Sequence, residues 1–378
     1  MKRYLSFSVL LLFVLSGTVL PNSWLELDVT ERNDGGYFTL QTDVDDIVTK
    51  TARILDVGDS YIDRNNHRYE VIGFDEDTIK VELKEVVTLP NVADILPTTA
   101  QPTFLQRVFG LTATTGTQDN NWNTIGIYFT HNAESYVPTS GVESKDEGDI
   151  QEVGKTLAEA LRADGFEVVV SENSHLPHDG EAYSRSRRTV MEMIQQQQPA
   201  TLIDIHRDAT PPEVYATQIE GQDATRIRIV VGRQNQNREA TLEYAKRIKA
   251  LADEQFPDMI EGIFDAKGNY NQDLGPRMIL LEFGAHTNPL KHAQTAAEFF
   301  AKVIPAAAGL SSPAAARSED GSVGAAARRS ILWVLGIAAA LTVGFVVLNK
   351  QGVGSLRIFL QRELAGKRSD NDGEENQE

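Results

Sequence analysis

Between residues 124 and 305, continuous apolar runs rich in β-branched residues alternate with segments whose apolar side chains recur at helical spacing. The runs are IGIYFT, FEVVVS, ATLIDI, IRIVVG and MILLEF. Helical spacing occurs between the first two runs, at Val153, Leu157 and Leu161, and again between the last two. Strands that are apolar along their whole length are covered on both faces. The pattern therefore predicts one α/β domain over residues 122–305, with a mostly parallel sheet covered by helices on both faces.

The residues that flank this domain have other patterns. Short β-rich runs and turn signals alternate over residues 24–89, which predicts a small β domain. Residues 90–121 are rich in Pro, Thr, Gln, Asn and Gly, a composition typical of a linker. Residues 306–329 consist mainly of Ala, Ser and Gly with scattered charges, which predicts a low-complexity tether.

Both ends of the chain contain apolar segments that predict a membrane association. Residues 1–23 combine two basic residues with a long apolar run, so we expect a secretory signal peptide or an uncleaved signal anchor. Residues 331–348 are 18 uncharged residues, which predicts a transmembrane helix over residues 330–349. More basic residues follow this segment than precede it, so the charged tail at residues 350–378 is expected to be cytoplasmic. The α/β domain should then lie at the cell membrane, on its extracytoplasmic side.

Composition excludes several classes of partner and site. The chain has 54 acidic and 36 basic residues and a formal net charge of -18. A field of that sign repels phosphates, so nucleic acid is not an expected partner. The chain has no cysteine, which excludes disulfides, thiol catalysis and thiolate metal sites. Any metal ion must therefore be held by histidine and carboxylate side chains.

Candidate metal ligands follow two of the predicted strands. Open α/β sheets bind ligands outside the carboxyl ends of their strands. His131 follows the first run, with Glu134 three residues later, and His206 ends the third run in ATLIDIHRDA. Two imidazoles, one carboxylate and an open fourth position make a catalytic zinc shell, so we predict Zn²⁺ bound by these three residues. Glu282, inside the apolar run MILLEFGAHTN, is the predicted general base.

These residues also have structural alternatives. Glu134 taken alone is typical of a solvated loop carboxylate. His206 is surrounded by charges in IDIHRDA and could belong to an ion-pair network. Glu282 could instead form a buried salt bridge, with Arg207 or Arg277 as its partner.

Other polar residues near the site receive weaker predictions. Asp149 competes with Glu134 as an acidic ligand, but Asp149-x-x-Glu152 before an apolar helix is typical of a capping box. His175 and His178 lie in a loop that contains Pro and Gly, and the sequence does not predict them as ligands.

Several long stretches, in order, resemble the stage II sporulation protein P family, cell-wall hydrolases of spore-forming bacteria. They are YFTHNAESYVP, GKTLAEALRADGFEVV, AYSRSRRTV, LIDIHRDA, IVVGRQN, YNQDLGPR and ILLEFGAHTN. Together they cover nearly the whole predicted α/β domain, and VGDSYIDRNNHRYEV before it resembles the segment often found upstream in this family. Two features depart from the family pattern: the second membrane segment, and Phe129 where the first motif often has another histidine.

The resemblance implies a zinc-dependent N-acetylmuramoyl-L-alanine amidase that removes stem peptides from peptidoglycan, together with endopeptidase action on cross-links. It also implies service in sporulation and engulfment beside sporulation proteins D and M. The last stretch is similar to the segment that carries the catalytic glutamate of zinc-dependent amidases, which supports Glu282. By the same resemblance, Asn271, Gln272 and Asp273 are expected to line a pocket or position a loop.

Two other classes of function are compatible with the sequence. A non-catalytic wall-binding scaffold could keep the fold without the chemistry, although Glu282 and both predicted histidine ligands are present. A zinc carboxypeptidase acting on wall peptides would need a cation for the terminal carboxylate of its substrate, and Arg187 and Arg207 are the candidates.

Overall fold

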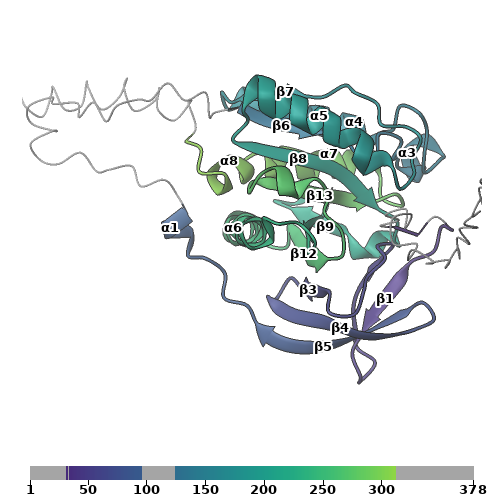
Figure 1. The fold of residues 1–378 in the computed structure, drawn as a ribbon. Coiled ribbons are helices and arrows are strands. Elements are labelled where there is room, and N and C mark those ends of the chain that lie inside the picture. The colour runs from purple at the N-terminus through teal and green to yellow at the C-terminus, as the bar shows by residue number, and fades with distance from the viewer. Residues whose placement is uncertain (1–30, 33, 96–123, 312–378) are drawn as a thin grey trace, which may run out of the picture. The chain divides into compact units, whose positions relative to one another are not determined.

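The computed structural model of the chain describes residues 31–32, 34–95 and 124–311, whose fold is shown in Figure 1. In this part of the chain, eleven strands form one sheet and two further strands form a hairpin. The strands are β1 (Phe38–Gln41), β2 (Ile47–Thr51), β3 (Ser60–Ile62), β4 (His67–Asp75), β5 (Thr78–Val86), β6 (Thr124–Tyr128), β7 (Glu167–Val170), β8 (Thr201–Asp208), β9 (Ala216–Ile219), β10 (Gln222–Thr225), β11 (Ile227–Gly232), β12 (Ile260–Ala266) and β13 (Met278–Ala285). The helices are α1 (Val92–Ile95), α3 (Val137–Ser140), α4 (Ile150–Ala163), α5 (Ala182–Gln197), α6 (Arg238–Gln255), α7 (Leu290–Phe300) and α8 (Ile304–Ala307), with the short 3-10 turns η1 (Pro212–Val214) and η2 (Gln272–Leu274).

The strand order of the large sheet is β2-β1-β5-β4-β3-β12-β11-β13-β8-β6-β7. From β12 to β7, neighbouring strands are parallel except for the antiparallel pair of β11 and β13. The five predicted apolar runs form β6, β7, β8, β11 and β13. The prediction of an α/β fold with a mostly parallel sheet in this region is therefore confirmed.

Strand β12 and the hairpin of β9 and β10 are not among the predicted strands. The sequence of β12 is IEGIFDA, so charged residues and a glycine interrupt its apolar run. Both of its charged side chains are buried in ion pairs, Glu261 with Arg228 and Asp265 with Arg238. A carboxylate is tolerated in a covered strand when such a partner neutralises it. The partners lie on other elements, which is why the pattern of β12 alone does not reveal a strand.

The β-rich segment at the start of the described chain continues the same sheet. Strand β3 pairs antiparallel with β12, with Tyr61 opposite Phe264. Leu40 of β1 belongs to the same hydrophobic cluster as Val230 of β11. Figure 1 shows β1, β3, β4 and β5 gathered below β12. The prediction of a separate small β domain over residues 24–89 is therefore corrected: its strands form, but they bury their apolar side chains in the core of the α/β region.

Different layers cover the two faces of the sheet. Helices α4, α6 and α7 pack on one face, where Ile127, Ile203 and Leu281 belong to one core cluster. On the other face, Val190 and Met193 of α5 pack against β6 and β8. Strands that precede the linker cover the remainder of that face. Helices therefore cover both faces, as predicted, but on the second face α5 shares this role with β strands.

Several predicted segments lie outside the described residues. They are the signal segment 1–23, the transmembrane helix 330–349 and the tail 350–378, with most of the linker 90–121 and of the tether 306–329. Within the described ranges, no helix is long and apolar enough to cross a membrane. The folded core extends a few residues into the predicted tether, because Ala307 and Leu310 are buried.

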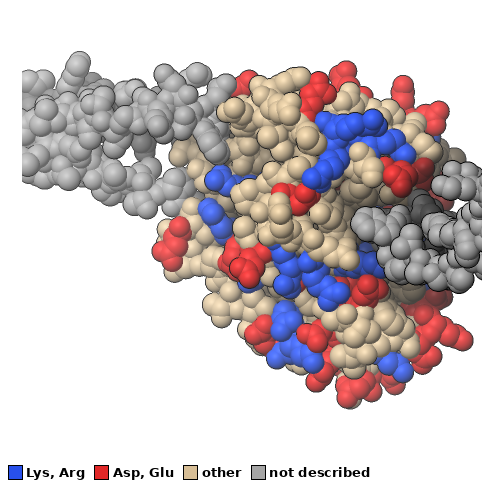
Figure 2. Space-filling model, in the orientation of Figure 1, with Lys and Arg blue, Asp and Glu red and all other residues tan. Residues whose placement is uncertain are grey.

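The surface mixes both signs of charge. On the face shown in Figure 2, basic side chains form small groups beside acidic ones. Ion pairs such as Arg68 with Glu85 and Arg64 with Asp258 are largely exposed to solvent. Exposed pairs of this kind contribute little to stability. The charges that constrain this fold are therefore the buried ones.

Gly262 of β12 leaves the space that Tyr61 of β3 fills. A methyl group at Gly262 would overlap the Tyr61 side chain, which is buried and donates a hydrogen bond to Glu261 Oε2 (2.7 Å). We expect Gly262→Ala to lower the free energy of unfolding by about 1–3 kcal/mol, the usual cost of overpacking a core. Thermal melting measures this loss. Gly73→Ala on β4 is the matched control, because a methyl group there meets nothing within 4 Å. Equal destabilisation by both substitutions would contradict the packing argument.

Candidate functional site

Strand β8 places its polar residues on one face of the sheet. Its sequence is TLIDIHRD, so Asp204, His206 and Asp208 occupy alternate positions. Successive side chains of a strand point to opposite faces, and Ile203 and Ile205 join the core cluster under α4, α6 and α7. The three polar side chains therefore point to the other face, where all are buried. They need partners from whatever covers that face, because burying unpaired polar groups is costly.

The loop after β6 brings His131 and Glu134 to the same face. Thr130 fixes the start of this loop, because its backbone N and its Oγ1 both donate to the Asp204 carboxylate (2.9 and 2.6 Å). Glu134 is completely buried, and its Oε1 lies 3.1 Å from His131 Nδ1 and 3.3 Å from His206 Nδ1. The structure thus brings the three predicted ligand residues together around one carboxylate oxygen.

The charges of this cluster depend on one another. Burial alone would raise the pKa of Glu134, but the imidazoles of His206 and His131 hold it well below 4.5. Its Oε2 also accepts a hydrogen bond from the backbone N of Arg207 (2.8 Å). Burial alone would lower the pKa of His206, but the carboxylates of Asp204 and Glu134 raise it well above 6.5. A metal ion that binds His206 must therefore displace a proton.

His178 joins the cluster, although the sequence does not predict it as a ligand. Its ring centre lies 4.1 Å from that of His131, and ligand atoms of His131, Glu134 and His178 lie within 4.8 Å of one another. Although the residue as a whole is exposed, loss of water around its imidazole, and then the neighbouring His131, lower the pKa of His178 to about 4, so the imidazole is neutral at pH 7. The loop after β7 starts at the same edge of the parallel sheet as the loops after β6 and β8. That shared edge is the signal that could have identified His178.

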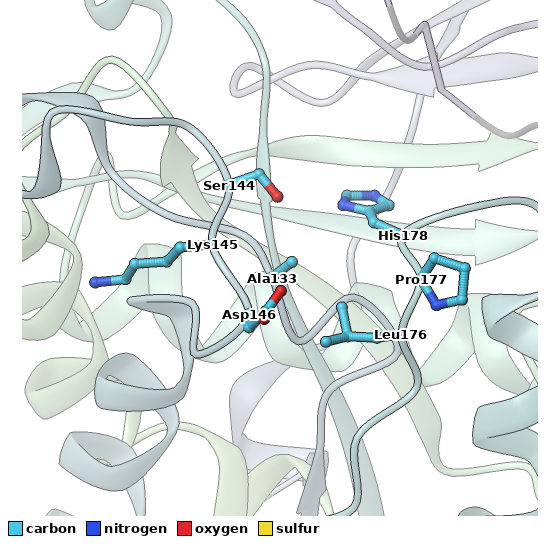
Figure 3. A pocket seen from close by; sticks show the side chains of 7 residues that line it. All are labelled: Ala133, Ser144, Lys145, Asp146, Leu176, Pro177 and His178. Carbon is cyan, nitrogen blue, oxygen red and sulfur yellow. The ribbon is translucent and has the colours of Figure 1, made fainter.

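An open pocket adjoins His178 and has a volume of about 510 Å³. Its lining residues are Ala133, Ser144, Lys145, Asp146, Leu176, Pro177 and His178. Figure 3 shows the ring of His178 at the pocket, whereas the side chain of Lys145 extends away from it. In the same loop, His175 has a structural role, since its Nδ1 lies 2.7 Å from the backbone O of Phe129. Of the clustered residues, the pocket therefore borders His178 directly.

Glu282 of β13 lies beside His206 on the sheet. The two residues are register partners on neighbouring parallel strands, so their side chains share a face. Glu282 is buried and accepts hydrogen bonds from Arg53 Nη2 (2.6 Å) and from the hydroxyl of Tyr215 (2.9 Å). The structure therefore places the predicted base next to a predicted ligand, within a buried ion pair that involves Arg53.

The arginines expected from the sequence have other partners. Arg207 and Arg277 donate hydrogen bonds to backbone carbonyl groups, so the expectation that either one pairs with Glu282 is corrected. Arg187 donates two hydrogen bonds to the Asp273 carboxylate (2.7 and 2.6 Å). Local sequence cannot identify the true partner, because Arg53 and Glu282 are 229 residues apart in the chain.

Asp149 and the YNQDL segment hold loops in place. Asp149 is the N-cap residue of α4, as predicted, but its carboxylate accepts a hydrogen bond from Ser140 and makes no side-chain cap to the helix. Asn271 Nδ2 donates to Ser186 Oγ (3.0 Å). Gln272 accepts from the backbone N of Gly232 and donates to a backbone O of β11, both at 2.8 Å. These bonds attach the loop after β12 to α5 and β11.

The sequence matches one protein family across most of the described region. A family model of Stage II sporulation protein P (SpoIIP) matches residues 60–305, more than half of the chain. The chain belongs to this family. Stage II sporulation protein P of Bacillus subtilis (strain 168) is 32% identical to it over 197 residues, which are 47% of this chain and 49% of the relative. This SpoIIP family member thus spans about half the length of that curated relative.

Solved structures similar to this SpoIIP family member include two amidases. The N-acetylmuramyl-L-alanine amidase Ami1 of Mycobacterium smegmatis is 16% identical, with a TM-score of 0.35, over 49% of this chain and 94% of the amidase. The CwlD amidase of Clostridioides difficile, solved in complex with the GerS lipoprotein, is 17% identical, with a TM-score of 0.32. That match covers 49% of this chain and 95% of CwlD.

The pKa of Glu282 predicts a pH-dependent contribution to stability. Burial and then the nearby Asp208 carboxylate raise this pKa from 4.5 to about 7, although Arg53 opposes the shift. A carboxyl group with a raised pKa stabilises the folded state fully below pH 4.5, and this contribution is lost as the pH rises towards 7. Its size is on the order of 3 kcal/mol, since one pKa unit corresponds to about 1.4 kcal/mol.

We therefore expect the metal-free wild type to lose stability relative to Glu282→Gln as the pH rises from about 5 to about 7.5. Thermal melting of both proteins across that range measures the difference, and the glutamine variant removes only the titrating group. A difference in melting temperature that stays constant with pH would show that Glu282 keeps an ordinary pKa.

Proposed function

We propose that this chain is a zinc-dependent peptidoglycan hydrolase that cleaves the amide bond between N-acetylmuramic acid and L-alanine. The observation that supports it best is the pair of histidines around Glu134, with Glu282 beside them on the sheet. Membership of the SpoIIP family supports action during sporulation. The sequence resemblance implies that the substrate is the cell wall. We further propose that the domain works in engulfment on the extracytoplasmic side of the membrane, beside sporulation proteins D and M.

The donor atoms of the cluster are suited to a zinc ion. Zn²⁺ binds imidazole nitrogen and carboxylate oxygen at about 2.0–2.2 Å, so two ligands of a tetrahedral ion lie roughly 3.3 Å apart. The distances from Glu134 Oε1 to His131 Nδ1 and His206 Nδ1, 3.1 and 3.3 Å, are close to this value. Asp204 Oδ1 lies 3.0 Å from His206 Nε2, where a carboxylate would orient a metal-binding imidazole. The residues whose ligand atoms all lie within 4.8 Å of one another are His131, Glu134 and His178, a set that does not include His206, so His178 competes with His206 as the third ligand.

The chemistry divides between the metal ion and the protein. Zinc bound here would polarise the amide carbonyl and make water a better nucleophile near neutral pH. Glu282 accepts the proton of the attacking water and returns it to the leaving amine. Arg53 and Tyr215 hold the two oxygens of Glu282, and each oxygen keeps a second lone pair that can accept this proton. The Asp204 carboxylate faces the other ring nitrogen of His206, at 3.0 Å from Nε2, and stabilises the positive charge of that ring when it is protonated.

The contacts of the arginines weigh against a zinc carboxypeptidase. Such an enzyme needs a cation to bind the terminal carboxylate of its substrate. Arg187 already pairs with Asp273, and Arg207 donates to the backbone O of Glu143. A wall-binding scaffold has no use for a buried glutamate beside two histidines, because burying such groups costs stability. Hydrolysis of the amide bond is the function that uses these side chains.

The proposed activity is tested with the purified full-length protein and isolated peptidoglycan. We expect mass spectrometry to detect free stem peptides, whereas cut cross-links would reveal endopeptidase action. A chelator should stop release and added Zn²⁺ should restore it. His206→Ala should lose bound zinc and activity together, while the control His292→Ala on α7 keeps both. Absence of any released fragment from the zinc-loaded wild type would contradict the proposal.

The role of Glu282 is tested by Glu282→Gln. The substitution keeps the shape of the side chain and leaves the metal ligands in place, but it removes the proton acceptor. We expect zinc content to stay unchanged while turnover falls at least roughly a hundredfold, the usual cost of losing a general base. Turnover that is retained with a lowered melting temperature would show that Glu282 serves only as half of a buried ion pair.

A further inference from the structure

Arg53 reaches the site from outside the region that the family model matches. It follows β2 in the chain, whereas the match begins at residue 60. Its side chain is fully buried, with Nη2 2.6 Å from Glu282 Oε1 and Nη1 3.0 Å from the Tyr270 hydroxyl. A completely buried guanidinium is expensive unless it is paired. Its position beside Glu282 therefore requires an explanation.

Arg53 holds Glu282 together with a second donor from another part of the chain. It donates to Oε1, while the hydroxyl of Tyr215 donates to Oε2 (2.9 Å). The terminal torsion of a glutamate is soft, so one donor would leave the carboxylate plane free to rotate. Two donors on opposite oxygens fix that plane next to His206, the register partner of Glu282.

Arg53 is itself fixed before any substrate binds. Glu31, which forms an isolated β-bridge with Arg53, places its Oε1 3.5 Å from Arg53 Nη2. The backbone N of Ala52 donates to Asp208 Oδ1 on β8 (3.1 Å), which ties this segment to the strand that carries His206. The guanidinium also lies 5.2 Å from the centre of the Tyr270 ring. A donor held in this way needs no rearrangement to orient its partner.

We propose that Arg53 is a positioning residue for the reaction: it sets the orientation of the Glu282 carboxylate, so the strands before the α/β region complete the active site. The inference rests on the proposed function, because it takes Glu282 as the base. Arg53 acts through Glu282, to which it donates its hydrogen bond. Its loss should therefore affect turnover, kcat, more than substrate binding or zinc content.

The test is a double-mutant cycle in the full-length protein, with kcat, KM, zinc content and melting temperature measured for each variant. Arg53→Met removes the donor and keeps an apolar side chain. We expect kcat to fall by about 10–100-fold, as for other residues that orient a reacting group, with KM and zinc content unchanged. In the Glu282→Gln background the same substitution should change kcat less than about twofold, because its effect passes through the missing carboxylate.

Two further variants make the test decisive. Lys249→Met is the matched control, because Lys249 is also a buried cation, paired with Asp253 (2.6 Å) on α6. It should lower the melting temperature and leave kcat per folded molecule unchanged. Arg53→Lys keeps the charge but loses the fork of the guanidinium. We expect it to fold and to recover part of the kcat lost in Arg53→Met, and it carries the test if the methionine variant does not fold.

The outcomes separate this inference from the proposed function. A zinc-loaded wild type that releases no wall fragments would overturn the proposed function, and this inference with it. With an active wild type, full kcat in Arg53→Met or in Arg53→Lys would overturn the positioning role alone. The positioning role would also be overturned if Arg53→Met lowered kcat equally in the wild type and in the Glu282→Gln background, because this would show that Arg53 only supports the fold.

Discussion

The row of His206, Glu282 and Arg228 across neighbouring strands of one sheet is the constraint on which the rest of this structure depends. These residues are register partners on β8, β13 and β11, and each is almost completely buried. A soluble sheet normally buries apolar side chains at such positions, because an unpaired charge there costs several kcal/mol. The segments that cover this row therefore supply polar partners as well as apolar surface.

The residues that cover this face include such polar partners. Arg228 pairs with Asp208 and Glu261, and Thr49 of β2 accepts a further hydrogen bond from its guanidinium. Arg53, close to Thr49 in the chain, pairs with Glu282. The β-rich segment is therefore bound to the α/β region by charge pairing as well as by apolar packing. This explains why it continues the sheet and does not form a separate domain.

Local patterns in the sequence predict part of this architecture. Apolar runs locate five strands of the α/β region, and the rule that parallel strands end at one edge brings His131 and His206 to one place. Local patterns do not predict the partner of Glu282, because an ion pair between segments 229 residues apart leaves no periodic signal in the sequence. His178 is not predicted as a ligand for a related reason. Its loop has no regular spacing of residues, and only the fold shows that its ring lies against that of His131.

The hydroxyl of Tyr215 connects the buried carboxyl groups of Glu282 and Asp208, and this contact affects proton transfer. It lies 2.9 Å from Glu282 Oε2 and 3.0 Å from Asp208 Oδ2, yet a phenol has only one proton to donate. One of the two contacts is therefore strongest when the carboxyl group itself carries a proton. Burial and Asp208 raise the pKa of Glu282 to about 7, so below neutral pH Glu282 carries the proton, and above it the ionised carboxylate accepts the hydrogen bond from Tyr215 described above. In the proposed reaction, a carboxyl group with a much lower pKa would be a poor acceptor for the proton of water, and one with a much higher pKa would return it poorly to the leaving amine.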